Sequence, residues 1–222
     1  MNGWGIVISF AFVFAVIGIA QVVLKLRLAT PAATRKIVHI GVSHWWLIAM
    51  ACFDSWYYAI VGPVAFVLIN IASFVFRLFP AMEHEQRSRN LGTIYFPISL
   101  VFLVLLAWTG QVEIWIAGMG VLILGWGDGL ASMLGERFGK PRITLFGNRK
   151  SILGTATMFV ASAVVAFVFL LAFGGSGNTV TMVVASLATA AVATTIEVVT
   201  PLGLDNLTVP ILTTLFVSAV WS

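Results

Sequence analysis

The chain has 222 residues, of which 60% are hydrophobic and only 9% are charged, and its mean hydropathy is +1.06. These proportions exclude an ordinary soluble domain and indicate a protein whose solvent is the bilayer. The formal net charge of +4 does not indicate nucleic acid, because the basic residues lie beside apolar segments, where they set topology or meet anionic lipid and phosphate.

Apolar runs long enough to cross about 30 Å of hydrocarbon predict seven or eight transmembrane helices in a single domain over residues 1–222. The runs lie at about 3–24, 37–53, 55–76, 94–110, 112–127, 151–173, 180–199 and 207–221. The last run is short and the break at Gly110-Gln111 is tight, so either could be a half-helix or a re-entrant element. The fold class we expect is an all-α, multi-pass integral membrane bundle without a cleaved signal peptide.

The distribution of charge predicts the orientation. If the N-terminus is outside, all twelve Lys and Arg residues lie in cytoplasmic loops or at the helix ends beside them, as the positive-inside rule requires. Most acidic residues lie on the same side, although acids do nothing for orientation. We therefore expect the active site at the cytoplasmic face, and the protein in the inner membrane of a prokaryotic cell. Whether it forms a homodimer stays open.

The densest polar segment is glycine-rich and basic and covers about 125–155, with the sequence GWGDGLASMLGERFGKPRITLFGNRKSILGT. Glycines let backbone N–H groups approach phosphate oxygens, and the basic side chains supply charge, so we expect a nucleotide-binding loop that is not a Walker loop. Its phosphate-binding candidates are Gly127, Gly129, Lys140, Arg149 and Lys150.

Two predicted helix starts also offer donors to phosphate. Ser151 follows Arg149 and Lys150 directly at the start of the sixth helix, and Asn90 and Thr93 lie at the start of the fourth. Phosphate binding at these helix starts and simple helix capping explain the residues about equally well.

Three acids on the cytoplasmic side predict a metal site. Asp128 lies at the inner end of the fifth span, where a carboxylate is costly unless it is used; the alternative is a salt bridge to Arg149 or Lys150. Glu197 lies in an otherwise apolar helix, and Asp205 follows with Asn206 in a turn, where turn chemistry is the alternative. Carboxylates of this kind form a Mg²⁺ shell in phosphate sites, so the metal ligands we expect are Asp128, Glu197 and Asp205.

The segment RKIVHIG, at the start of the second helix, places Arg35 and His39 on one face with Lys36 beside them. His39 could bridge a phosphate or relay a proton near neutral pH, or make a satisfied polar contact at a helix end. His44 is expected to serve packing.

Together the motifs RKIVHIG, NLGTIYFP, GDGLASMLGERFGK, NRKSILGT and E-x-x-T-P-x-x-x-DNLTVP resemble, in the same order, those of the polyprenol kinase family. That family includes dolichol, phytol and CTP-dependent diacylglycerol kinases. The resemblance runs from Arg35 to Pro210. It implies transfer of the terminal phosphate of CTP to a lipid alcohol with Mg²⁺, so the implied partners are CTP, a long-chain alcohol and membrane lipids.

The resemblance also implies roles. Asp128 matches the family's GDG acid, and Arg35, Lys36 and His39 match its early basic motif. Lys140, Arg149 and Lys150 match its nucleotide segment, and Glu197, Asp205 and Asn206 its C-terminal acidic motif. We expect Asp128, Lys150 and His39 to be catalytic. The alternatives are a CTP enzyme similar to phosphatidate cytidylyltransferases and, further off, a transporter of a phosphorylated solute.

Overall fold

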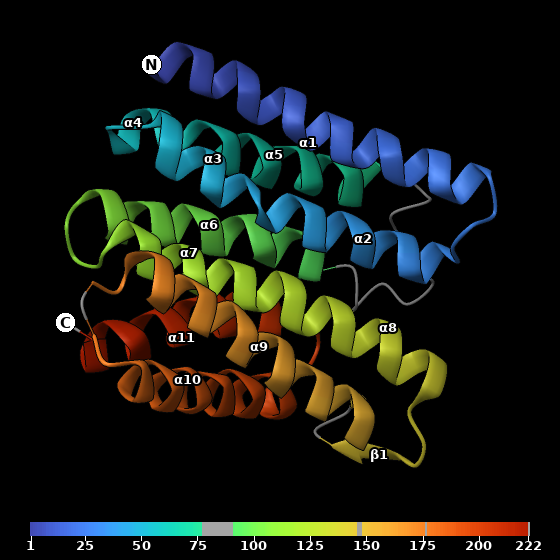
Figure 1. The fold of residues 1–222 in the computed structure, drawn as a ribbon. Coiled ribbons are helices and arrows are strands. Elements are labelled where there is room, and N and C mark those ends of the chain that lie inside the picture. The colour runs from blue at the N-terminus through green and yellow to red at the C-terminus, as the bar shows by residue number, and fades with distance from the viewer. Residues whose placement is uncertain (77–90, 146–147, 176, 222) are drawn as a thin grey trace.

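The computed structural model describes residues 1–76, 91–145, 148–175 and 177–221 of the chain. Over these residues the protein is a bundle of helices with one short β-hairpin at one end (Figure 1). The helices of the N-terminal half are α1 (Asn2–Lys25), α2 (Pro31–Ser43), α3 (Trp45–Cys52), α4 (Trp56–Ala59), α5 (Val61–Phe76) and α6 (Gly92–Trp108). The C-terminal half contains α7 (Ile114–Ile123), η3 (Leu124–Asp128), α8 (Gly129–Phe138), β1 (Arg142–Leu145), β2 (Asn148–Ser151), α9 (Ile152–Phe173), α10 (Thr179–Val199) and α11 (Asp205–Trp221).

Each expected span overlaps a helix or a run of consecutive helices, so the prediction of a helical membrane protein is confirmed. Within the described ranges, five helical stretches are long and apolar enough to cross a membrane, judged by length and composition. They are Asn2–Lys25, Trp56–Phe76, Ile114–Phe138, Ile152–Phe173 and Thr179–Val199. The helices α6 and α11 are shorter and apolar. The number of spans and their orientation stay predictions.

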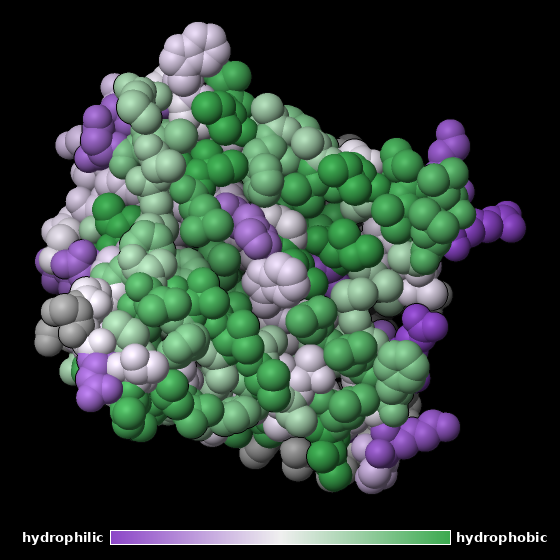
Figure 2. All heavy atoms as spheres, in the orientation of Figure 1, coloured by the Kyte–Doolittle hydropathy of each residue, from purple (hydrophilic) through white to green (hydrophobic). Residues whose placement is uncertain are grey.

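Charged residues gather at the ends of the bundle. The end of α1, the start of α2, the end of α8 and the hairpin lie at one end, and these segments, with the turns that follow α1 and α8, contain the lysine and arginine residues of the described ranges. The connection from α3 to α4, which contains Asp54, and the connection from α6 to α7, which contains Glu113, lie at the opposite end. Figure 2 shows polar side chains at both ends of the molecule and a predominantly apolar surface between them, as expected for a bundle surrounded by lipid.

The fifth span continues past the expected boundary at residue 127, because α7, η3 and α8 follow one another without a break from Ile114 to Phe138. The element η3 is a single π-helical turn, a feature found mostly at functional sites. Of the segment at about 125–155, where we expect nucleotide binding, residues 125–138 are therefore helix and not an open loop, and nucleotide binding by the segment stays a prediction. Its second part contains the hairpin, which the sequence did not predict; the strands pair antiparallel from Arg142 with Ser151 to Leu145 with Asn148.

Glycines allow the central helix to pack closely against its neighbours, as small residues do between membrane helices. A Cβ atom at Gly120 in α7 would lie 2.6 Å from the carbonyl oxygen of Pro210 in α11, and closer still to Oγ1 of Thr214. The backbone of α11 cannot move away without disturbing the start of that helix, so α7 and α11 are fixed relative to each other by this contact.

We predict that Gly120→Ala lowers the free energy of unfolding by about 1–3 kcal/mol through overpacking, measured by unfolding in detergent. Gly18→Ala in α1 is the matched control, because a Cβ there meets no atom within 4 Å. Alanine is the better helix former by about 1 kcal/mol, so the control keeps or gains stability. Equal stability of the two variants would contradict the close contact.

Candidate active site

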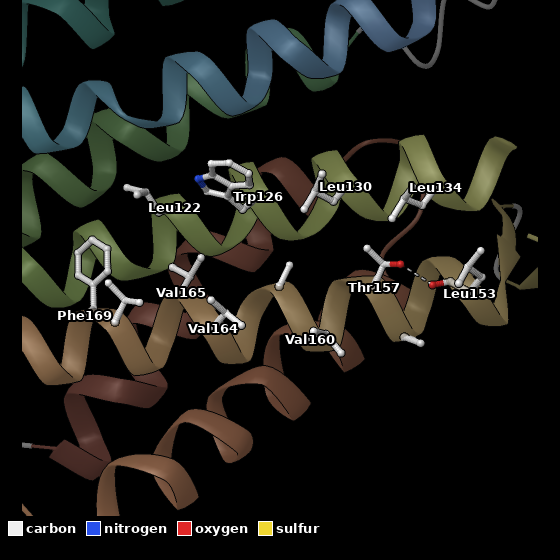
Figure 3. Close-up of a pocket in the computed structure, with 13 residues that line it drawn as sticks. Leu122, Trp126, Leu130, Leu134, Leu153, Thr157, Val160, Val164, Val165 and Phe169 are labelled. Atoms are coloured by element: carbon white, nitrogen blue, oxygen red, sulfur yellow. Dashed lines mark hydrogen bonds between the residues drawn. The ribbon is translucent and has the colours of Figure 1, made fainter. Parts of the chain in front are cut away.

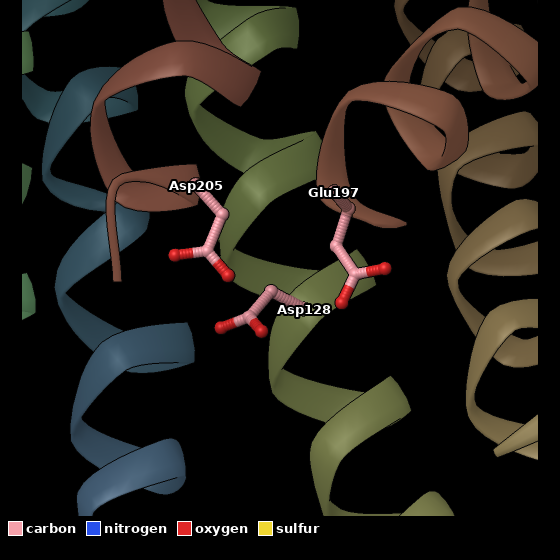
Figure 4. Close-up of side chains that lie close together, drawn as sticks. All are labelled: Asp128, Glu197 and Asp205. Atoms are coloured by element: carbon pink, nitrogen blue, oxygen red, sulfur yellow. The ribbon is translucent and has the colours of Figure 1, made fainter. Parts of the chain in front are cut away.

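Three carboxylates from separate parts of the chain meet at the basic end of the bundle. Asp128 closes η3, Glu197 lies in the last turn of α10, and Asp205 is the first residue of α11 (Figure 4). One oxygen of each lies within 4.8 Å of one oxygen of the others. The residues are 6%, 5% and 9% exposed, respectively. The three expected metal ligands are thus brought together by the fold, in a position where like charges repel unless cations oppose them.

Two lysines oppose these charges. Nζ of Lys36 in α2 donates to Oδ2 of Asp128 at 2.7 Å, and Nζ of Lys150 in β2 donates to Oε1 of Glu197. Of the two alternative partners expected for Asp128, Lys150 binds Glu197 instead, and the side chain of Arg149 lies outside the described residues. Burial by itself lowers the pKa of the Lys36 ammonium, but nearby carboxylates, Asp128 foremost, outweigh burial and hold that pKa above its usual value. Lys36 is therefore cationic at neutral pH.

Lys150 also satisfies a backbone group that α10 leaves open. In a continuous helix the carbonyl of Glu197 would accept from the backbone nitrogen of residue 201, but Pro201 has no N–H. Nζ of Lys150 donates to this carbonyl at 3.1 Å. A cation is favoured at a helix C-terminus, where the helix dipole is negative. The hairpin therefore fixes Lys150 against both the side chain and the backbone of Glu197.

The orientation of Asp205 is set by the turn before α11. Leu202 and Gly203 have φ values of 60° and 79°, and this left-handed pair reverses the chain after α10. Asn206 then donates to Oδ1 of Asp205 from its backbone N at 3.0 Å and from Nδ2 at 3.1 Å. The amide of Asn206, expected to bind phosphate, thus serves to orient the carboxylate.

His39 lies beside the cluster. Its Nε2 is 3.9 Å from Oδ2 of Asp128, and it is buried without a hydrogen-bond partner among the described residues. The ring stands edge-on to Phe96, with centroids 4.9 Å apart. Because a buried polar atom without a partner is costly, Nε2 is available for a group that enters the site.

Gly127 and Gly129 stay phosphate-binding candidates, but the structure shows that both also serve the packing of helices. Both residues are helical, so their backbone lies in the helix and not in an open loop. A Cβ at Gly127 would lie 2.5 Å from Sδ of Met158 in α9, and one at Gly129 would lie 2.7 Å from Cδ1 of Ile40 in α2. These glycines permit close helix packing around Asp128.

The remaining candidates make none of the carboxylate–lysine contacts that the structure describes. Oγ of Ser151 accepts from the backbone N of Gly154 at 3.1 Å, which confirms the capping alternative. Arg35 precedes Lys36 in α2 and interacts electrostatically with Glu136. Lys140 is exposed after α8. Asn90 and the side chain of Arg149 lie outside the described residues.

Thr93 lies near the start of α6, and its carbonyl accepts from Nδ2 of Asn70 at 2.9 Å. This carbonyl would otherwise face Pro97, which has no N–H to donate. The preceding Gly92 packs on the turn before α11, since a Cβ atom added at this position would lie 3.0 Å from Nδ2 of Asn206. The start of α6 therefore lies next to the turn that contains Asn206, as the expected role of Thr93 at the site requires, although phosphate binding by Thr93 itself stays a prediction.

An apolar groove of about 710 Å³ lies away from the carboxylates, between α7–α8 and α9 (Figure 3). Its walls include Leu122, Trp126 and Leu130 on one side and Val160, Val164 and Phe169 on the other. The lining is aliphatic and aromatic except for Thr157, whose hydroxyl donates to the carbonyl of Leu153.

Fold and site together define a helical membrane protein with a buried carboxylate–lysine centre at one end of its bundle. The chain is 36% identical over 202 residues to a phytol kinase from Synechocystis sp., a match that covers 89% of the chain and 83% of that relative. It therefore belongs to the polyprenol kinase family.

More distant relatives agree with this assignment. Probable phytol kinases of the chloroplast from Glycine max and Zea mays are each 27% identical over 85% of the chain, and the matches cover 65% and 67% of their own lengths. The chain thus spans about two thirds of these plant relatives. No family model matches the chain, and neither does any solved structure.

We predict that Lys150→Met lowers the free energy of unfolding by about 3 kcal/mol, because it leaves a buried carboxylate and a carbonyl unopposed. Adding Glu197→Gln removes the unpaired negative charge, so we expect the double variant to recover part of the lost free energy of unfolding. Lys140→Met is the control: its side chain is exposed, and we expect a change within about 0.5 kcal/mol. Denaturant unfolding of all four proteins tests the pair, and a Lys150→Met variant as stable as the control would refute it.

Proposed function

We propose that the protein transfers the terminal phosphate of CTP to the hydroxyl group of a long-chain lipid alcohol, with Mg²⁺ as cofactor. The observation that carries this proposal is the cluster of Asp128, Glu197 and Asp205 with Lys36 and Lys150 at one end of an apolar bundle. A buried centre of this kind serves chemistry on charged phosphates, and its place at the end of the helices brings it near the membrane boundary. Membership of the family supports a kinase over the cytidylyltransferase alternative.

The fit of the cluster to a divalent cation supports the proposed cofactor. Mg²⁺ in phosphate sites takes one or two carboxylates together with water and substrate oxygens, at about 2.0–2.1 Å. Asp128, Glu197 and Asp205 would hold it, since their oxygens lie within 4.8 Å of one another and two lysines leave one of three negative charges unbalanced. When bound, Mg²⁺ supplies the charge that neutralises phosphate oxygens.

In the proposed reaction the alcohol oxygen forms a bond to the terminal phosphorus of CTP, and the bond from that phosphorus to the leaving CDP breaks. The hydroxyl proton passes to a buried base, for which His39 Nε2 and a carboxylate oxygen of the cluster are the candidates. Lys150 would oppose charge on the phosphate, with Arg35, Lys140 and Arg149 as further proposed contacts. Positioning and electrostatics supply most of the rate.

The sidedness of the reaction follows from charge. With the basic end in the cytosol, as the positive-inside rule requires, CTP reaches the site from water while the alcohol keeps its tail in lipid. Because the relatives are named phytol kinases, we propose an isoprenoid alcohol of the phytol class as the acceptor. Polyprenols and diacylglycerol are the competing acceptors.

The experiment for this function incubates the purified protein in lipid with Mg²⁺, an alcohol panel and CTP labelled at either the α or the γ phosphorus. We expect γ label, and no α label, in the lipid product, with phytol the best acceptor. Transfer of the α label would instead support a cytidylyltransferase, and no transfer to any lipid would contradict the proposal. Asp128→Asn is expected to abolish transfer without unfolding the protein.

The proposed cofactor has a test that needs no turnover. We expect Mg²⁺ to raise the unfolding temperature of the wild type, because binding stabilises the folded state. Asp205→Asn removes this shift, yet in EDTA it unfolds no lower than the wild type, since a charge repelled by two carboxylates is gone. Glu113→Gln, an acid at the opposite end, keeps the full shift. A Mg²⁺ shift that survives Asp205→Asn would remove that residue from the site.

A further inference from the structure

The π-helical turn η3 determines where Asp128 points, because Asp128 is its last residue. The turn packs against both α2 and α9, and the turn together with Gly129, the residue that follows it, contacts α2 and His44 at the end of that helix. Lys36 pairs with Asp128, and Ile40 packs on Gly129, where a Cβ would lie 2.7 Å from Cδ1 of Ile40. These two contacts are at or beside the carboxylate cluster.

The other two contacts lie further from the cluster. A Cβ at Gly125 would lie 2.5 Å from the Cβ of Ser43, so this glycine permits the close approach of α2. Nε1 of Trp126 donates to Nε2 of His44 at 3.2 Å, and the rings stand edge to face with centroids 5.7 Å apart. Trp126 lies two residues before Asp128 in the same turn.

In the hydrogen bond between Trp126 and His44, the donor and the acceptor can be assigned. His44 stands at the break between α2 and α3, where its Nδ1 lies 2.8 Å from the carbonyl oxygen of Ile40. A carbonyl only accepts, so Nδ1 carries the proton and Nε2 is left as the acceptor that the indole N–H requires. Trp126 lines the apolar groove, whose other described walls offer its N–H few polar partners besides His44. His44 thus does more than the packing expected of it.

We propose that the His44–Trp126 hydrogen bond is a positioning device, which holds η3 against α2 and so keeps the Asp128 carboxylate within reach of Glu197 and Asp205. The inference rests on the proposed metal site and extends it to two residues that touch neither metal nor substrate. Partners that orient metal ligands typically change metal affinity by 10- to 100-fold when removed. Because this pair does not contact Asp128 directly but acts through one turn of helix, we expect a loss of metal affinity of about tenfold, the lower end of that range.

The test measures binding of Mn²⁺, as a stand-in for Mg²⁺, to the full chain in detergent by the electron paramagnetic resonance signal of the free ion. Trp126→Phe keeps an aromatic side chain and removes the indole N–H donor, and we expect Mn²⁺ to bind roughly tenfold more weakly. His44→Leu gives a similar loss, and the double variant is no weaker than either single one, because both remove the same bond. His44→Gln, which can still accept, recovers part of the affinity.

Trp108→Phe is the matched control. Nε1 of Trp108 also donates a hydrogen bond, to the carbonyl of Phe53 at 3.1 Å, but at the opposite end of the bundle. We expect its Mn²⁺ affinity to equal that of the wild type, even if its unfolding temperature falls as much as that of Trp126→Phe. Unchanged affinity in Trp126→Phe overturns the positioning role alone, whereas a wild type that binds no Mn²⁺ contradicts the proposed metal site and this inference with it.

Discussion

The structure depends on the burial of three carboxylates within 4.8 Å of one another at the end of an apolar bundle. Such a cluster persists only where cations and donors oppose its charge. The chain supplies these from distant segments: Lys36 from the second helix, Lys150 from the hairpin, and the backbone and side-chain amides of Asn206 from the turn before α11. The hairpin and that turn are therefore parts of the site, since without them Glu197 and Asp205 would be unopposed and unoriented.

Close helix packing brings the three acids together. Gly127 allows α9 to approach the central helix, and Gly129 allows α2 to approach it, on either side of Asp128. In the π-helical turn between these contacts, Trp126 and Asp128 are two residues apart and face different surroundings, since Trp126 lines the apolar groove while Asp128 is buried. One short segment therefore serves both the packing of the bundle and the aim of a carboxylate, which explains why glycines are so dense there.

The sequence predicts the features that depend on whether a side chain is stable in an apolar environment. Hydropathy gave the positions of the helices, and the cost of acids near hydrocarbon singled out Asp128, Glu197 and Asp205, which the fold brings together. Features that depend on local backbone geometry could not be predicted from the sequence. Composition does not distinguish a glycine in a phosphate-binding loop from a helical glycine that permits a close neighbour, and Gly125, Gly127 and Gly129 are of the second kind. Whether Lys150 pairs with Asp128 or Glu197 depends on the hairpin register, which four-residue strands with weak alternation do not reveal.

The central claim is that these three carboxylates form one metal-binding centre for phosphate transfer. It is tested most directly by diffraction from crystals grown with Mn²⁺ and a non-hydrolysable CTP analogue, using the anomalous signal of the metal. The account predicts a peak bonded to oxygens of Asp128, Glu197 and Asp205, with the terminal phosphate of the analogue beside it. A metal held elsewhere, or a nucleotide bound away from this cluster, would contradict it.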